Sequence, residues 1–172
     1  MNNYSWLQQR LHQLSLSSQF MREVTFDVEK SSIRTNQRRD NHVFVVGLAR
    51  SGTTALLNAL YESTEFASLS YKDMPFVLAP NLWSKLSFNK QRIKLVERAH
   101  RDGIKVSTES PEAFEEVFWM TFNQSHKDTK EKFQTYVQLI SQKYQKNRYL
   151  SKNNQNIRRL ELISRTFPHS NI

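Results

Sequence analysis

A run of apolar residues, a loop bounded by two glycines and a helix that follows at once constrain this chain more than any other feature. Residues 43–46 are all apolar, as expected of a strand covered on both faces. Gly47 and Gly52 permit backbone angles and close approaches that a side chain would block. Thr53 and Thr54 then open a helix whose free N–H groups and positive dipole end point back into the loop. The sequence therefore predicts a preformed anion site, whose usual ligand is phosphate.

The spacing of this loop is close to that of a Walker A loop, G-x-x-x-x-G-K-S/T, but the lysine is missing. Thr53 stands where that lysine would reach the β- and γ-phosphates of a triphosphate. The nearest cation is Arg50, inside the loop. The pattern thus predicts a phosphate-binding loop whose positive charge comes from Arg50 inside the loop and not from a lysine after the second glycine. The alternative is a structural turn between strand and helix with incidental glycines.

Residues 49–54, Ala-Arg-Ser-Gly-Thr-Thr, resemble the 5′-phosphosulfate loop of sulfotransferases that use 3′-phosphoadenosine 5′-phosphosulfate (PAPS). In most of that family a lysine precedes the Ser/Thr-Gly-Thr-Thr run, where this chain has Arg50. The resemblance implies an α/β fold of P-loop type, with a mostly parallel sheet and helices on both faces. It also implies that PAPS is the donor substrate, and that its 5′-phosphosulfate is held by Arg50, Ser51, Gly52, Thr53 and Thr54.

A second resemblance lies in residues 114–119, Phe-Glu-Glu-Val-Phe-Trp. They are similar to the Glu-Val/Ile-x-Phe-Phe segment of heparan-type sulfotransferases, whose glutamate is the acceptor base, and the match maps this role onto Glu116. The chemistry needs such a group, because the acceptor hydroxyl or amine loses a proton as it attacks sulfur. The alternatives are an alignment shifted to Glu115 or Glu112, or an ordinary amphipathic helix with solvated glutamates.

A third resemblance lies in residues 151–154, Ser-Lys-Asn-Asn, which look like the lysine turn that the same family places before a helix ending in Phe-Pro. In the family this lysine contacts the sulfate or the bridging oxygen, which implies that role for Lys152. The alternative is a surface lysine at the end of a strand.

The resemblance covers residues 40–172, the N-terminal part of a sulfotransferase domain. The strand and helix that carry the family's arginine and serine for the donor's 3′-phosphate are not in this sequence. We therefore expect a C-terminally truncated domain with impaired activity and a tendency to self-associate, because a sheet edge would be left unpaired.

Helical periodicity and strand patterns alternate along the chain. We expect helices over residues 4–21, 53–63, 90–101, 113–119, 129–146 and 155–166, and strands over residues 43–46, 66–71, 104–108 and 148–152. We expect the following leucines and isoleucines to face inward: Leu56, Leu57, Leu60, Ile157, Leu160 and Ile163. The alternation predicts a mostly parallel sheet, in which ligands lie at the carboxyl ends of strands. The glycine loop, Lys152 and the segment around Glu116 all follow predicted strands, so we expect them at one edge.

Length and composition limit the class of protein. The 172 residues predict a single domain over residues 1–172, in which residues 1–40 form an N-terminal helix and a loop leading into the core. There is no cysteine, no apolar run of the roughly 20 residues that span a bilayer and no signal-peptide pattern, so we expect a cytoplasmic protein without a transmembrane segment. None of the five histidines has zinc-site spacing, so no metal is expected.

The net charge of +9, concentrated in residues 87–172, suits nucleic acid, an acidic lipid face or a polyanionic small ligand. No nucleic-acid motif accompanies it, and PAPS itself is polyanionic. The sequence thus favours transfer of a sulfuryl group from PAPS to a hydroxyl or amine of a small-molecule, glycan or lipid acceptor, with Glu116, Arg50 and Lys152 as catalytic residues. The alternatives are a P-loop kinase or nucleotide-binding enzyme, and a non-catalytic sulfotransferase-like fragment.

Overall fold

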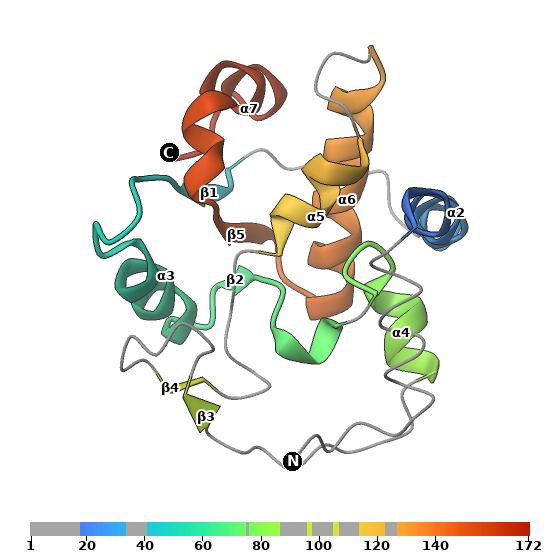
Figure 1. Ribbon diagram of the computed structural model, residues 1–172, viewed down its shortest axis with the longest axis horizontal. Helices are drawn as coiled ribbons and strands as arrows, with labels where there is room; N and C mark the ends of the chain where they lie inside the picture. The colour runs from blue at the N-terminus through green and yellow to red at the C-terminus, as the bar shows by residue number, and fades with distance from the viewer. Residues whose placement is uncertain are drawn as a thin grey trace.

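A small parallel sheet lies at the centre of the protein, as the computed structural model in Figure 1 shows; the structure describes residues 18–33, 41–74, 76–86, 96–97, 105–106, 114–122 and 127–172. Its strands pair in the order β1 (Val43–Val45), β5 (Arg148–Lys152) and β2 (Phe66–Ala67). Val43 lies opposite Leu150 and Val45 opposite Lys152. Asn171 makes a further parallel bridge to Val43 along the other edge of β1.

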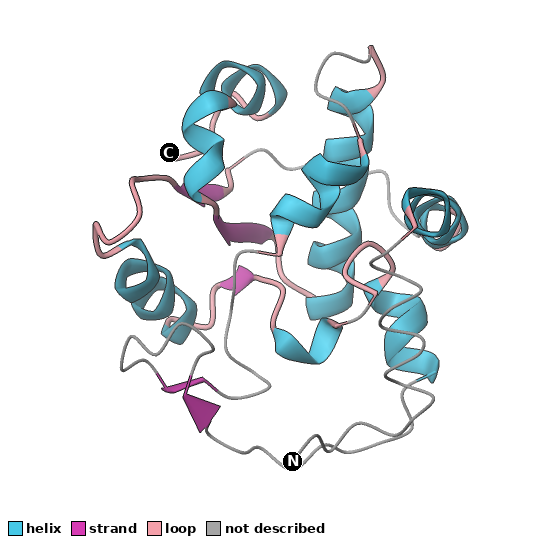
Figure 2. Cartoon of the chain, in the orientation of Figure 1, coloured by secondary structure: helices cyan, strands magenta, loops and turns pink. Residues whose placement is uncertain are grey.

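Helices cover both faces of this sheet (Figure 2). The helical elements in chain order are α2 (Gln19–Lys30), α3 (Thr53–Glu62), the 3₁₀ turn η1 (Tyr71–Asp73), α4 (Pro80–Leu86), α5 (Glu115–Thr121), α6 (Thr129–Tyr144), the 3₁₀ turn η2 (Asn154–Arg158) and α7 (Leu160–Thr166). In Figure 1, α3 lies to the left of the strands and α6 to their right. The α/β fold with a parallel sheet is therefore confirmed.

The side chains of the strands alternate between two apolar clusters. Leu150 and Val45 pack with Leu57 of α3 and Phe66 of β2. On the opposite face, Phe44 and Tyr149 join a larger cluster with residues of α5, α6 and α7. Phe133, Tyr136, Val137 and Ile140 of α6 are buried in this larger cluster.

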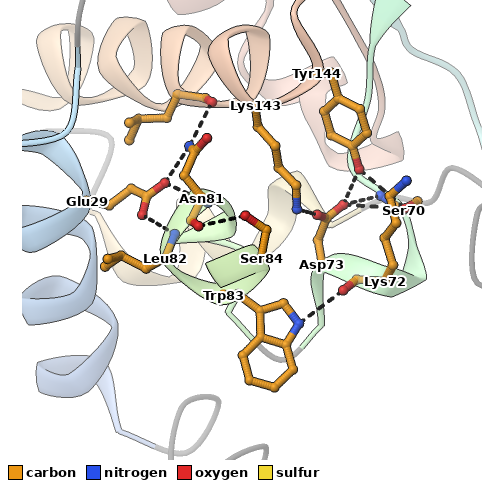
Figure 3. A network of polar contacts seen from close by, with 11 residues as sticks. Glu29, Ser70, Lys72, Asp73, Asn81, Leu82, Trp83, Ser84, Lys143 and Tyr144 are labelled. Carbon is orange, nitrogen blue, oxygen red and sulfur yellow. Dashed lines mark hydrogen bonds and ion pairs between the residues drawn. The ribbon is translucent and has the colours of Figure 1, made fainter. Parts of the chain in front are cut away.

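Two buried carboxylates tie the segment between β2 and α4 to the rest of the protein (Figure 3). Glu29 of α2 accepts hydrogen bonds from the backbone N–H groups of Asn81 and Leu82, at 2.8 and 2.9 Å, and so caps the start of α4. Asp73 accepts from the Ser70 N–H at 2.7 Å and pairs with Lys143 of α6. We call Glu29, Asp73 and the groups bonded to them the α4 anchor.

Asp73 also accepts a hydrogen bond from the Tyr144 hydroxyl at 2.6 Å. Burial raises the pKa of Tyr144 far above its usual value, and the neighbouring charge of Asp73 raises it further. Tyr144 therefore stays protonated and serves as a permanent donor to the anchor.

The helix predicted over residues 90–101 is wrong where the structure describes it. Residues Val96–Glu97 form β3, which pairs antiparallel with β4 (Lys105–Val106), so that Val96 lies opposite Val106. This segment is a strand because it pairs with β4, and the spacing of its own apolar residues does not indicate that pairing. The strand predicted over residues 104–108 is confirmed at residues 105–106, and the rest of the predicted helix lies outside the described residues.

Two further predicted elements are shorter or broken. The strand predicted over residues 66–71 ends at Ala67, because Ser70 and Asp73 form a capping box that turns the chain into η1. The helix predicted over residues 155–166 is split at Arg159 into η2 and α7. A 3₁₀ turn has three residues per turn, so the inward face predicted from a period of 3.6 does not hold there.

Three residues expected to face inward are substantially exposed: Leu56 at 52%, Ile157 at 48% and Leu160 at 39%. Leu57 and Ile163 are fully buried as predicted. The sheet has only three short strands besides the Asn171 bridge in the described residues, so α3 meets it along a narrow stripe centred on Leu57.

The N-terminal helix differs from its predicted range. Residues 1–17 lie outside the described residues, and α2 continues past the predicted end at residue 21 to Lys30. The Ser18 side chain caps its start by accepting from the Met21 N–H at 3.4 Å. Phe26 and Glu29 are buried in the last turns, so tertiary contacts extend this helix through its β-branched residues. No helix in the described ranges is both long and apolar enough to cross a membrane.

Candidate functional site

The loop between β1 and α3 has the backbone of an anion-binding turn. Arg50 and Gly52 both adopt left-handed angles, with φ of 69° and 82°. Such residues turn successive N–H groups toward a common concavity, and Gly52 passes directly into the N-terminus of α3 without a side-chain cap. The Ser51 hydroxyl and N–H both donate to the Leu48 carbonyl, at 2.7 and 3.3 Å, and close the loop. The first-turn N–H groups of α3 are thereby left open to a ligand.

The loop needs glycine at position 47 because of limited space, and at position 52 because of the backbone angle. A Cβ atom at Gly47 would lie 2.8 Å from the Thr53 methyl carbon and 2.9 Å from the Ser51 hydroxyl oxygen. One atom belongs to the loop and the other to the first residue of α3, so a side chain at Gly47 would push the loop away from the strand. Gly52 has free space around it but a backbone angle that L side chains rarely adopt.

The five residues predicted to bind the donor, Arg50 to Thr54, form this loop and the start of α3. Thr53 is buried, and Thr54 is half-buried beside it. Arg50 is exposed, and no described residue forms an ion pair or side-chain hydrogen bond with it. Arg50 also holds a left-handed φ that costs a non-glycine residue about 1 kcal/mol. Strain of this kind gathers at ligand sites, which fits a charge held ready for an anion.

Lys152 is the last residue of β5 and lies beside the loop. It pairs with Val45, and the next N–H along, that of Asn153, donates to the Val45 carbonyl at 3.2 Å. Since side chains alternate along a strand, Lys152 is on the same face as Leu150, which packs against α3. The predicted lysine and the glycine loop therefore lie at the same edge of the sheet.

The surroundings of Lys152 fit an anionic ligand. The residue is only 9% exposed, and in the part of the chain that the structure describes no carboxylate or hydrogen-bond acceptor pairs with it. A largely buried lysine whose ammonium has no protein acceptor is stabilised when an anion joins it. The phosphosulfate of PAPS, held by the loop, would supply that anion.

Glu115 belongs to the core and not to the ligand side of α5. It is 2% exposed and accepts hydrogen bonds from the Trp119 indole at 2.8 Å, the Asn156 amide at 2.7 Å and the Tyr149 hydroxyl at 3.1 Å. Burial raises the pKa of Tyr149, and the neighbouring Tyr136 and Glu115 raise it further, so this donor stays protonated. Glu115 therefore has no access to an acceptor, and Glu112, the other alternative, lies outside the described residues.

Glu116 points to the opposite side, where its carboxylate meets the residues after β5. Its Oε2 accepts from the Asn153 amide at 2.6 Å and from Arg159 Nη1 at 2.7 Å, while Oε1 accepts from Arg159 Nη2 at 2.9 Å. Burial alone would raise its pKa, but the hydrogen bonds from Arg159 and Asn153 and the charge of Arg159 outweigh it, so the pKa of Glu116 lies below its usual value. The side chain is 33% exposed, so a ligand can still approach it.

The structure thus brings the three predicted catalytic residues to one edge. The glycine loop follows β1, Lys152 ends the neighbouring β5, and Glu116 bonds to Asn153, the residue after Lys152. Two members of this edge, Asn153 and Arg159, were not predicted from the sequence. Their only signal was a polar turn followed by a helix start, which does not reveal a partner on α5. The catalytic roles of Arg50, Lys152 and Glu116 remain predictions.

Among the described residues, the buried histidine lies away from this edge. His42 is buried and packs 4.8 Å from the Phe167 ring, and its Nδ1 accepts the Tyr149 N–H at 3.0 Å. Within the described ranges, no group of three histidine or carboxylate side chains is placed to hold a metal ion.

Comparison with known proteins agrees with this geometry. A family model described as "Sulfotransferase family" matches residues 42–172, a range that includes the glycine loop, α5 and the turn after β5. Searches of curated proteins and of solved structures gave no match.

Proposed function

Because this chain belongs to the sulfotransferase family, we propose that it moves a sulfuryl group from PAPS to the hydroxyl or amine of an acceptor. The observation that carries the proposal is the pairing of the glycine loop with Lys152. A strained loop with open N–H groups and a buried lysine without a partner in the described residues meet at the end of two adjacent strands. Together they suit a ligand with several negative charges.

The donor substrate would be held by its 5′-phosphosulfate. The N–H groups of residues 51–54 and the hydroxyls of Thr53 and Thr54 would bind the phosphate and sulfate oxygens. Arg50 and Lys152 would stabilise the charge that develops on the bridging oxygen as its bond to sulfur breaks. Arg50 is the charged side chain of the loop, in the place where most of the family has lysine. A guanidinium stays protonated at working pH, so Arg50 would act through charge and hydrogen bonds only.

The transfer balances as a single displacement at sulfur. The acceptor oxygen or nitrogen forms a bond to sulfur, the bond between sulfur and the bridging oxygen breaks, and adenosine 3′,5′-bisphosphate leaves with that electron pair. The acceptor's proton passes to the carboxylate of Glu116, which acts as the general base. In-line attack requires donor and base on opposite sides of the reacting sulfur, as in phosphoryl transfer.

The acceptor we propose is a small molecule, a glycan or a lipid head group that carries a hydroxyl or amine, in the cytoplasm. The basic charge of residues 87–172 attracts an anionic donor or acceptor by the same electrostatics.

Ligand-dependent melting tests the donor assignment. Adenosine 3′,5′-bisphosphate and PAPS should raise the melting temperature, and ATP with magnesium should not, because Thr53 replaces the Walker lysine. Lys152→Ala and Arg50→Ala should each reduce the shift, because each removes a positive charge from the site. Lys130→Ala is the matched control, since it removes an exposed lysine of α6 far along the chain from the loop. Stronger stabilisation by ATP with magnesium would replace the proposal with a P-loop kinase or nucleotide-binding enzyme.

A further inference from the structure

We propose that Arg159 is the positioning residue for Glu116, holding its carboxylate so that Oε1 is the oxygen that takes the acceptor's proton. This inference rests on the proposed function, since it takes Glu116 as the base. Arg159 stands at the junction of η2 and α7, in the helical segment that follows the predicted lysine turn, and no site role was predicted for it from the sequence.

The geometry of the ion pair selects one oxygen. The two terminal nitrogens of Arg159 reach the two oxygens of Glu116 at 2.7 and 2.9 Å, which is the bidentate arrangement that fixes a carboxylate in a plane. Oε2 accepts a second hydrogen bond, from the Asn153 amide at 2.6 Å. Each carboxylate oxygen offers two lone pairs. Oε2 is therefore filled, whereas Oε1 keeps one lone pair for a proton.

Arg159 is itself held by the core. It is 8% exposed, its guanidinium carbon lies 5.0 Å above the Trp119 ring, and Nη1 also donates to the Asn156 side chain at 3.2 Å. Trp119 and Asn156 both donate to the buried Glu115. Glu115 thus holds the two groups that hold Arg159, and the position of Glu116 is tied to the rigid interior.

Arg159 is the positive group in direct contact with Glu116 among the described residues. Lys152 is one residue before Asn153, and Glu115 on the same helix turns into the core. Arg22 of α2 and Lys132 of α6 meet α5 at its far end, at Thr121 and Phe122. The lowered pKa of Glu116 agrees with this arrangement. The ion pair with Arg159 keeps the Glu116 carboxylate ionised and fixes its orientation, although it lowers the basicity of Glu116. Arg159 therefore contributes by positioning the base.

Carboxyl NMR titration of Glu116 and the pH dependence of turnover together test the proposal. Arg159→Gln should raise the pKa of Glu116 to its ordinary value of 4.5 or above, because burial then acts unopposed by charge. The acid limb of the pH profile of kcat should also shift to higher pH. The value of kcat should fall about 100-fold, because a displacement of about 1 Å at a reacting group has a cost of that size. The KM for PAPS should stay unchanged. Arg158→Gln, at the exposed neighbouring arginine, is the matched control and should change neither quantity.

Two further variants separate position from folding. Arg159→Lys keeps the positive charge but cannot make the two parallel hydrogen bonds of a guanidinium, so the pKa of Glu116 should stay low while kcat still falls. If Arg159→Gln does not fold, Arg159→Lys provides the test in its place. Added guanidinium ion should partly restore kcat in Arg159→Gln, which loss of structure would not allow. An unchanged pKa and kcat profile in an active Arg159→Gln enzyme would overturn the positioning role and leave the proposed function standing. A wild-type chain that binds PAPS and transfers no sulfate to any acceptor would overturn both.

Discussion

The α4 anchor and the edge of the sheet both consist of charged groups, and they differ in whether the chain satisfies those groups itself. In the anchor, Glu29 and Asp73 are fully buried, and each oxygen accepts from a backbone or side-chain donor (Figure 3). At the sheet edge, Lys152 has no described partner, and Glu116, although both its oxygens accept hydrogen bonds, has a side chain that is 33% exposed. Buried and paired charges stabilise the fold, whereas charges that are unpaired or partly exposed are available to a ligand.

Glu115 and Glu116, which are adjacent in the sequence, differ in the same way. Both glutamates accept three hydrogen bonds, but Glu115 is 2% exposed, whereas the Glu116 side chain, one residue later, is 33% exposed and paired with Arg159. Successive residues of a helix point about 100° apart, so one turns inward and the other toward the edge. A structural carboxylate and a proposed catalytic one thus share a helix turn.

The largest expected effect is the loss of turnover when the proposed base, Glu116, is replaced, which distinguishes it from the structural Glu115. Glu116→Gln should lower kcat roughly 100- to 10,000-fold while donor affinity stays nearly intact, because the base acts in the transition state. Steady-state assays with PAPS and calorimetric binding of adenosine 3′,5′-bisphosphate measure the two quantities. Glu115→Gln should instead reduce stability through the core. Normal turnover in Glu116→Gln, with turnover lost in a folded Glu115→Gln, would exchange the roles of the two glutamates.

The next effect concerns the anchor. Glu29→Ala leaves the Asn81 and Leu82 N–H groups and the Asn81 amide without their acceptor. Each unpaired donor costs about 1–3 kcal/mol, so the free energy of unfolding should fall by about 3 kcal/mol or more. Urea unfolding measures it, with Asp27→Ala on the exposed side of α2 as the control. Turnover per folded molecule should not change; a stable variant that has lost activity would contradict the division between the two regions.

Arg50 should show the reverse pattern. Arg50→Ala should change the free energy of unfolding by less than about 0.5 kcal/mol, because the side chain is exposed and has no described partner. Affinity for PAPS should fall at least about tenfold, the loss expected of a charge-assisted hydrogen bond worth about 1.5–3 kcal/mol. Arg50→Lys should retain substantial activity. Equal donor affinity in wild type and Arg50→Ala, measured by calorimetry, would remove Arg50 from the site.

The smallest effect is the pH dependence of the Glu116–Arg159 pair. The folded-state pKa of Glu116 is lowered, so the ionised group contributes stability that is fully present above the unfolded-state pKa and is lost as the pH falls through the folded-state value. The difference in unfolding free energy between wild type and Glu116→Gln should therefore shrink as the pH drops below the ordinary value of 4.5. Solvent screens this pair, so the change should stay below about 1 kcal/mol. A difference that grows on acidification would mean that the pair does not favour the ionised form.

Local patterns predicted most of what lies near the sheet, and contacts distant in sequence account for the rest. Helix α6 was predicted within two residues because its apolar periodicity is regular and long, and strand β5 because its short segment ends in a polar turn. The glycine loop was predicted because its chemistry is local. Strand β3 was missed because its identity depends on β4, and the break at Arg159 because a 3₁₀ turn has no strong pattern of its own.

The partners of the proposed base were missed for the same reason. Glu116 and Arg159 are separated by 43 positions in the chain, and nothing in either segment indicates that they meet. Sequence similarity pointed to the glutamate, whereas the group that orients it follows from packing of α5 against the turn after β5. The sequence thus predicted the residues proposed to contact the substrate better than those that hold them in place.

A backbone amide NMR titration of the wild-type chain with PAPS reports which residues contact the proposed donor. We expect the largest shifts at Gly47, Gly52, Thr53 and Thr54 and at Lys152 on the neighbouring strand, with little change at Asn81 and Leu82 in the α4 anchor. Saturating shifts confined to residues outside the loop and Lys152, or a loop that responds to ATP with magnesium and not to PAPS, would contradict the proposal that this edge of the sheet binds the sulfuryl donor.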